Sequence, residues 1–342
     1  MRLVLFLGCF LALAAGGIAW ILHRSGTSWE DLGKLAALPP GVLVLLAVLS
    51  VAIYAADMVR YRMVGHALGT HISWRAGLEA VVANFFFSWI SPAATLAAPA
   101  VIVVLARRGV SWDAAVLIAF GKSMIGSALL LVTAFVLLLV GAGPPLDPRV
   151  GLLLLPGAGM VAGFLLVLVL GALFPRPVLQ RIDALASGAR RLRPLSGPRA
   201  GRFIEGLAGV LTRAVGRLGQ LRAGGWRSVV TILASQVAYF ASFISVGVVL
   251  AWALGASSVP RAAGICTVYV AFLYTAPTPG ATGLAEVMAV AFFGSILPAK
   301  EAVMLMLMFR ALTIYLQVLL GIPYLLVAGG LGEILHARNR ER

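Results

Sequence analysis

The chain has 342 residues, of which 61% are hydrophobic and only 11% are charged, and its formal net charge is +15. Soluble domains carry about 25% charged residues, so this composition excludes an ordinary soluble protein and indicates a membrane protein. The positive charge does not indicate nucleic-acid binding, because the basic residues lie in the breaks between apolar runs. The two cysteines, Cys9 and Cys266, and four scattered histidines predict neither a disulfide framework nor a metal site, and we expect no cofactor.

Apolar runs of spanning length predict about six full transmembrane helices. A helix needs about 20 apolar residues to cross a hydrocarbon core of roughly 30 Å. The first run, 3–22, is longer than the apolar part of a signal peptide, about 7–15 residues, so we expect it to be retained as a helix. The six predicted helices occupy 3–22, 40–59, 114–140, 150–173, 229–254 and 302–330.

Two further apolar regions, 76–106 and 262–298, are interrupted near their middle by prolines. The first contains Pro92, and the second contains Pro277 and Pro279. The arms on either side hold about 14–17 residues, or roughly 21–26 Å of helix, which is short of a crossing. Proline removes a backbone donor, and a broken backbone at membrane depth is tolerated only inside protein or beside a watery cavity. We therefore expect two re-entrant helical hairpins, with kinked full crossings as the alternative.

The arginines predict the orientation. The stretch 174–228 carries eleven arginines, whereas the loops 141–149 and 255–261 on the opposite side carry one each. Positive residues favour the cytoplasmic side, so both termini and 174–228 are expected in the cytoplasm, with the protein in the inner (cytoplasmic) membrane. Within 174–228, apolar residues recur at three-to-four spacing from Ile204 to Leu218, which favours an amphipathic helix on the membrane surface. A solvated connector is the alternative.

The two broken regions resemble each other. Pro92–Ala98 aligns without gaps with Pro279–Ala285, and proline, alanine, threonine and alanine coincide. Lys122 follows Pro92 by 30 residues, and Arg310 follows Pro279 by 31 residues. With the predicted topology, the hairpins enter from opposite sides, as in the inverted repeats of transporters. The prediction is an all-α, single transmembrane domain, 1–342, with halves 40–173 and 229–330 joined by 174–228.

The second break also resembles a known family. Pro277-Thr-Pro-Gly-Ala-Thr-Gly-Leu-Ala-Glu286 is similar to the Pro-x-Pro-Gly-Gly-x-Gly-x-x-Glu signature of flippase-like membrane proteins related to the transmembrane domain of lysylphosphatidylglycerol synthase. Arg310-Ala-Leu-Thr-Ile-Tyr315 resembles the final helix of that family, and the resemblance covers roughly 40–330. The first motif departs from the family pattern Pro-Gly-x-x-Gly-Glu, because Ala93, Leu96 and Ala97 stand there.

The resemblance implies lipid translocation or a lipid-linked role. The lysyl-transferring members carry a separate soluble catalytic domain, and these 342 residues hold no such segment. They also hold no acid, base or nucleophile constellation, so we expect no enzymatic activity. The partners expected are membrane lipids with an anionic or phosphate-containing headgroup, and the oligomeric state stays open. A small-solute secondary transporter and a non-catalytic accessory subunit of a lipid-synthesis pathway are the alternatives.

Charged residues at membrane depth are the candidate binding residues, because each costs about 2.5–3.5 kcal/mol unless it meets a partner or a cavity. We expect Glu286, Arg310 and Lys122 to converge on a midplane cavity and contact a lipid headgroup. Alternatively, Glu286 caps the broken helix or pairs with Arg310, and each cation is structural. Asp57, beside Arg60, is expected to form an interfacial pair.

The remaining candidates lie within the hairpins. Glu79 and Asn84 are one to two turns into the first hairpin and are expected to line a cavity. The residues expected to shape the breaks are Pro92, Pro277, Pro279, Gly280 and Gly283.

Overall fold

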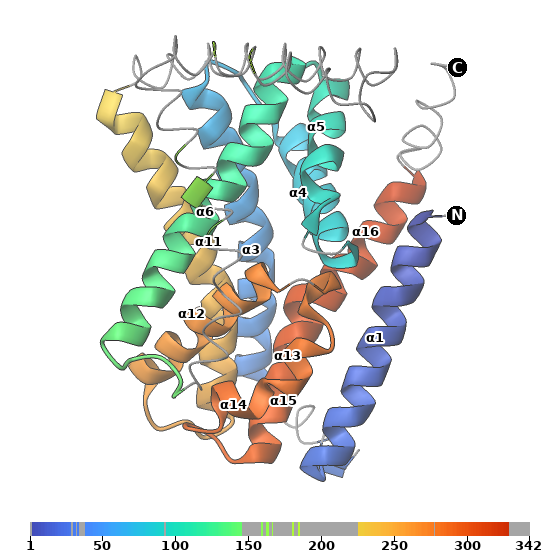
Figure 1. Ribbon diagram of the computed structural model, residues 1–342, viewed down its shortest axis with the longest axis vertical. Helices are drawn as coiled ribbons and strands as arrows, with labels where there is room; N and C mark the ends of the chain where they lie inside the picture. The colour runs from blue at the N-terminus through green and yellow to red at the C-terminus, as the bar shows by residue number, and fades with distance from the viewer. Residues whose placement is uncertain are drawn as a thin grey trace.

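The computed structural model describes residues 2–28, 38–91, 94–145, 225–276 and 278–327, with a few isolated residues between these ranges. Over this part of the chain the protein is entirely helical (Figure 1). Four helices are long and apolar enough to cross a membrane: α3 (Pro40–Ala67), α6 (Trp112–Leu139), α11 (Gly225–Ala253) and the continuous run Ala299–Tyr324. The chain is thus a polytopic membrane protein.

The four long helices correspond to four of the six predicted spans. The predicted segment 3–22 forms helix α1 (Arg2–Ser25). The predicted helix 150–173 and the basic stretch 174–228, up to residue 224, lie outside the described ranges. The run Ala299–Tyr324 is built from α15 (Ala299–Arg310), a π-helical turn η4 (Ala311–Tyr315) and the start of α16 (Leu316–Val327).

The outer surfaces of the long helices are apolar. On α6, Val132, Phe135 and Leu139 are 62%, 62% and 70% exposed. In water, a contiguous apolar surface of this kind would be unfavourable, whereas in a bilayer it faces acyl chains. The interior is also apolar, and α3 and α11 pack side by side through its centre (Figure 1).

The first broken region forms two helices. Helix α4 (Trp74–Ile90) has 17 residues and α5 (Ala97–Arg107) has 11, which correspond to about 25 Å and about 16 Å. The Ser91 hydroxyl donates to the Phe87 carbonyl at 2.6 Å and accepts from the Leu96 amide at 3.2 Å. These bonds satisfy backbone groups that the break would otherwise leave without partners. Pro92 lies outside the described residues.

The second broken region begins with helix α12 (Val259–Thr275), also of 17 residues. Its second arm was expected to be one helix, and that expectation is wrong. The chain instead forms a 3-10 turn η3 (Pro279–Ala281) and two short helices, α13 (Leu284–Val287) and α14 (Ala289–Phe293). The physical reason is the backbone at Gly280, Ala281 and Gly283, where φ is 57°, 56° and 84° and no right-handed helix can continue.

The two breaks share an unusual backbone geometry. Among the described residues, Ala94 (φ 53°) and Ala281 (φ 56°) are the non-glycine residues with positive φ. They are also the alanines at the third position of the two aligned segments. Each first arm has 17 residues and follows a serine that caps it, Ser73 for α4 and Ser258 for α12. The sequence likeness therefore extends to the conformation of the chain.

The two hairpins lie in opposite halves of the bundle (Figure 1). Helices α4 and α5 occupy the upper half, and α12, α13 and α14 occupy the lower half. Their tips meet, because a Cβ atom at Gly280 would lie 3.2 Å from the Trp89 carbonyl oxygen. The Trp89 and Tyr274 rings, at the ends of the two first arms, are 6.3 Å apart in an edge-to-face contact. The molecule thus brings its two breaks together near its centre.

Candidate functional site: two buried ionic networks and a lateral groove

The first ionic network surrounds Arg310, the last residue of α15, which is fully buried. Its Nε lies 3.0 Å from Glu286 Oε1, Nη1 donates to the Gly280 carbonyl at 3.0 Å, and Nη2 donates to the Thr282 hydroxyl at 2.9 Å. The positive φ at Gly280 ends the local helix and leaves that carbonyl available. Arg310 therefore bonds directly to the broken backbone.

Glu286 completes this arrangement, which we call the Glu286–Arg310 network. Its Oε2 accepts from the Gly283 amide at 2.7 Å, so the carboxylate caps the first turn of α13. The Tyr315 hydroxyl lies 3.2 Å from Arg310 Nε and 3.4 Å from Glu286 Oε1. Glu286 thus both caps the broken helix and pairs with Arg310, two contacts that were expected as alternatives.

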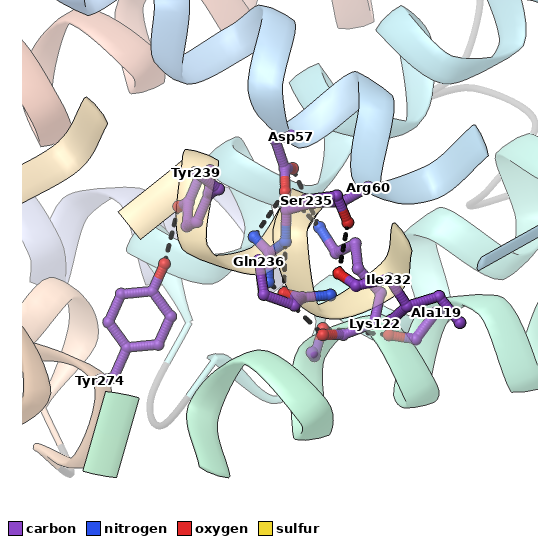
Figure 2. A network of polar contacts seen from close by, with 10 residues as sticks. Asp57, Arg60, Ala119, Lys122, Ile232, Ser235, Gln236, Tyr239 and Tyr274 are labelled. Atoms are coloured by element: carbon purple, nitrogen blue, oxygen red, sulfur yellow. Dashed lines mark hydrogen bonds and ion pairs between the residues drawn. The ribbon is translucent and has the colours of Figure 1, made fainter. Parts of the chain in front are cut away.

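The second network, which we call the Asp57–Lys122 network, joins three long helices (Figure 2). Lys122 on α6 donates through Nζ to both oxygens of Asp57 on α3, at 2.8 and 2.9 Å. Arg60 Nη1 donates to Asp57 Oδ1 at 2.7 Å, and Arg60 Nε donates to Gln236 Oε1 on α11 at 2.6 Å. All four side chains are buried.

Aromatic rings cover the two cations of the Asp57–Lys122 network. Lys122 Nζ is 3.9 Å from the centre of the Tyr61 ring, and the Arg60 guanidinium carbon is 4.1 Å from the centre of the Tyr239 ring. The Tyr239 hydroxyl shares a 2.7 Å hydrogen bond with the Tyr274 hydroxyl on α12 (Figure 2). These π faces attract the cations and shield them from the surrounding apolar side chains.

The two networks are separate in their contacts. Within the described ranges, Lys122 bonds to neither Glu286 nor Arg310, because its ammonium is directed to Asp57. The structure thus brings together two of the three residues expected to converge. Asp57 and Arg60 do pair, as expected, and both are buried inside the protein together with Lys122.

A groove of about 730 Å³ lies between α3, α4 and the η4–α16 segment. Apolar side chains dominate its walls, and the exposed Val51, Leu78 and Leu320 place its mouth on the outer surface of the bundle. Arg75 and Glu79 line it one turn apart on α4. The groove is therefore mostly apolar, has two charged residues on its α4 wall, and opens sideways, toward the space that lipid would occupy.

A family model described as the lysylphosphatidylglycerol synthase TM region matches residues 5–321. The chain belongs to this family. The matched residues include both breaks, both ionic networks and all the elements that line the groove up to Gly321. A comparison with curated proteins gives no match.

In this member of the lysylphosphatidylglycerol synthase transmembrane family, the candidate residues predicted within the two hairpins lie in different surroundings. Glu79 lines the groove and binds Arg108 at the end of α5 through two hydrogen bonds, one of them 2.7 Å from Arg108 Nε to Oε2. Asn84 is half-buried on α4 and is not among the groove-lining residues. Pro279, Gly280 and Gly283 form the second break, and Pro277 lies outside the described residues.

Some residues of this family member were not singled out from the sequence. Gln236, Thr282 and Tyr315 all bind the charged groups of the two networks. Gln236 had a usable signal, because an amide inside an apolar spanning helix usually has a partner. For Thr282 and Tyr315 the only signal was that they lie inside the two quoted motifs. Within the described ranges, no group of three or more His, Cys, Asp or Glu residues is placed to hold a metal ion.

Helix α1 covers the Glu286–Arg310 network. A Cβ atom at Gly17 would lie 3.3 Å from Gly283 Cα and 3.4 Å from the Glu286 carboxyl carbon. The Phe10 ring lies 6.1 Å from the Tyr315 ring and is buried. The opposite face of α1 is exposed, with Leu11 and Trp20 at 55% and 45%. The first helix therefore separates the network from the outer surface.

Proposed function

We propose that this protein translocates a lipid or lipid-linked substrate across the membrane and is not an enzyme. The groove between α3, α4 and η4–α16 is the observation that carries this proposal. A groove with apolar walls, a sideways mouth and charged residues within reach matches an amphiphile that enters from the bilayer. Its volume of about 730 Å³ falls inside the range of about 300–1,000 Å³ found for ligand sites.

The polar groups of the groove favour an anionic or phosphate-containing headgroup. Arg75 lies one turn before Glu79 on α4, and the Glu79 carboxylate is already bound to Arg108. The Tyr324 hydroxyl lies beside Glu79. With Glu79 paired, Arg75 contributes the remaining charge among the groove-lining residues, and guanidinium groups bind phosphate in a bidentate geometry.

The groove also holds a buried polar atom that an esterified lipid would satisfy. Tyr54 lines the groove, and its hydroxyl is buried with no hydrogen-bond partner in the described part of the protein. A buried hydroxyl without a partner costs free energy, which a lipid ester carbonyl in the groove would recover. Tyr54 lies on the apolar stretch of the wall, where such an ester would follow the headgroup.

The movement we propose uses an inverted repeat. The two hairpins lie in opposite halves of the bundle, their breaks share the positive-φ alanines Ala94 and Ala281, and their tips touch. In such repeats, one half rocks against the other around a central site. We propose that both hairpins are re-entrant and that both termini and the basic stretch 174–228 are cytoplasmic, as the arginine distribution favours.

A small-solute transporter is the second candidate, and the groove argues against it. A soluble substrate needs a closed path lined by polar groups, whereas this groove is mostly apolar and opens sideways. An accessory subunit that only binds lipid would also use the groove, but it would not move the lipid. One assay distinguishes a lipid translocator from these two alternatives.

The test is translocation in liposomes that contain the purified protein. A fluorescent phosphatidylglycerol in the inner leaflet should become accessible to an impermeant quencher faster than in protein-free liposomes. Leu316→Trp, which fills the groove, should slow this several-fold, whereas Leu319→Trp should not. Leu319 is the matched control, because it is on the same helix, 62% exposed and outside the groove.

The outcomes distinguish the candidates. No acceleration with either fluorescent phosphatidylglycerol or phosphatidylcholine would contradict translocation and favour an accessory role. Equal rates for Leu316→Trp and Leu319→Trp would show that lipid moves by another route.

A further inference from the structure

The Asp57–Lys122 network has unbalanced charge. Asp57 contributes one negative charge, and Arg60 and Lys122 contribute two positive charges, so the fully ionised network is +1. The Glu286–Arg310 network holds one charge of each sign and is neutral. An uncompensated charge in a buried, apolar environment is strongly unfavourable, because it gives up hydration without gaining an opposite charge.

Among the elements that the structure describes, none supplies a second negative charge to this network. Within the described residues, Asp57 is the one carboxylate that contacts Lys122 or Arg60. Helix α3 adds Tyr61, α11 adds Gln236 and Tyr239, and α12 reaches the network through the Tyr274 hydroxyl. These groups are neutral, and the charged residue of α5 is Arg107 in its last turn.

One group can restore neutrality by exchanging a proton. Arginine keeps its proton in proteins, so Arg60 is a fixed charge. Protonation of Asp57 would raise the network to +2. Loss of a proton from the Lys122 ammonium leaves a neutral amine beside the balanced Asp57–Arg60 pair, which keeps its 2.7 Å bond. A buried lysine can lose its proton, whereas an arginine keeps it. The matching position in the other half of the repeat holds an arginine, Arg310.

The Lys122 proton would also change the strength of the contact between α3 and α6. The charged Lys122 ammonium ties α6 to α3 through both oxygens of Asp57. The neutral amine would lose the ionic part of this attraction, while Arg60 would keep its 2.6 Å bond to Gln236 on α11 and its 3.4 Å bond to the Lys122 backbone carbonyl on α6. Helix α6 directly follows the first hairpin. The protonation state of Lys122 therefore changes how tightly the half that contains this hairpin packs onto the other half.

We propose that Lys122 is a proton-binding site that couples lipid translocation to proton movement, an inference that rests on the proposed function. In each cycle the Lys122 ammonium gives one proton to water on one side of the membrane and becomes a neutral amine. The amine later takes one proton from water on the other side. Nothing is oxidised or reduced, and the network alternates between charges of +1 and zero.

The first test uses the liposome assay with and without an imposed pH gradient, with fluorescent phosphatidylglycerol as the probe. The wild-type rate should change several-fold with the gradient. Lys122→Arg fixes the positive charge and Lys122→Met fixes neutrality, so both should lose the response. Lys300→Met is the matched control, because Lys300 is half-exposed, pairs with Asp31 and should leave the response intact. A gradient response in Lys122→Arg equal to wild type would overturn the proposal and make Lys122 a fixed ion-pair partner.

The second test does not depend on transport. Exposed lysines keep their protons below about pH 9. In a titration of the purified protein in detergent micelles, Lys122→Arg should therefore release about one proton fewer than wild type below that pH, and Lys300→Met should match wild type. Identical release from wild type and Lys122→Arg would overturn the proton site. If the wild type does not move lipid, that result contradicts the proposed function. The titration does not depend on transport and still tests whether Lys122 binds a proton.

Discussion

The two buried networks hold their cations in different ways. Arg310 takes its carboxylate from its own half of the protein, where Glu286 follows the second break and also caps α13. The ungapped alignment of the breaks puts Pro99 at the position of Glu286, so the first hairpin offers no carboxylate there. Lys122 instead pairs with Asp57, 65 residues earlier on a full-length helix.

This difference changes what each cation stabilises. Arg310 bonds to the Gly280 carbonyl and the Thr282 hydroxyl, so it stabilises the broken backbone of one hairpin. Lys122 and Arg60 connect α3, α6 and α11, and over the described part of the first hairpin their side chains bond to none of its residues. A buried cation needs a carboxylate, but the element that supplies it decides whether the pair fixes a local turn or the packing of distant helices.

The largest effect is expected from Arg310→Met. This change leaves the Glu286 carboxylate buried without its cation and removes the donors to Gly280 and Thr282. Loss of one partner from a buried pair costs about 3–5 kcal/mol of unfolding free energy. Thermal unfolding in detergent, followed by tryptophan fluorescence, measures this loss. Arg310→Lys keeps the charge and should lose less. Wild-type stability of Arg310→Met would show that the pair does not stabilise the break.

The next largest effect is expected from Asp57→Asn. It leaves Lys122 and Arg60 without their shared carboxylate, so unfolding should become easier by about 3 kcal/mol. Adding Lys122→Met removes one of the two unpaired cations and should recover part of the loss, with a coupling of about 0.5–3 kcal/mol. A double-mutant cycle on the same unfolding assay measures the coupling. Additive effects would mean that Lys122 and Asp57 do not interact energetically.

A smaller effect should come from Gly126→Ala on α6. A Cβ atom there would collide with the Arg60 guanidinium and the Gln236 amide oxygen, so the Asp57–Lys122 network would have to shift. Overpacking of this kind costs about 1–3 kcal/mol. Gly121→Ala is the matched control on the same helix, since nothing lies within 4 Å of its Cβ position. Equal unfolding temperatures for the two variants would show that the network is not tightly packed against α6.

The smallest effect is expected where α1 covers the Glu286–Arg310 network. Gly17→Ala puts a methyl group 3.3 Å from Gly283 Cα, which a small outward shift of α1 relieves. The cost should be at most about 1 kcal/mol, at the lower end for overpacking. Gly16→Ala has open space around its Cβ position and should match wild type. A loss from Gly17→Ala as large as that from Gly126→Ala would show that α1 is held rigidly over the network.

Much of the fold follows from local sequence. The four described spans agree with apolar runs of spanning length, and both breaks occur where prolines interrupt runs too short to cross. The second arm of the second hairpin could not be predicted as it is. Its apolar residues suit a helix, but positive φ at Gly280, Ala281 and Gly283 fragments it. That conformation is held by Arg310 and Glu286, which bond to the backbone of the break.

The sequence by itself determined that this is an all-helical membrane protein with paired breaks and buried charges, because hydrophobic length and proline act locally. It also contained the Glu286–Arg310 pair as an alternative, since both residues belong to quoted motifs. Only the tertiary structure decided the partner of Lys122. Asp57 and Gln236 lie 179 residues apart on α3 and α11, and Arg60 bonds to both of them. The packing of those two helices decides which polar side chains meet, because charges buried in an apolar interior must find each other across the sequence.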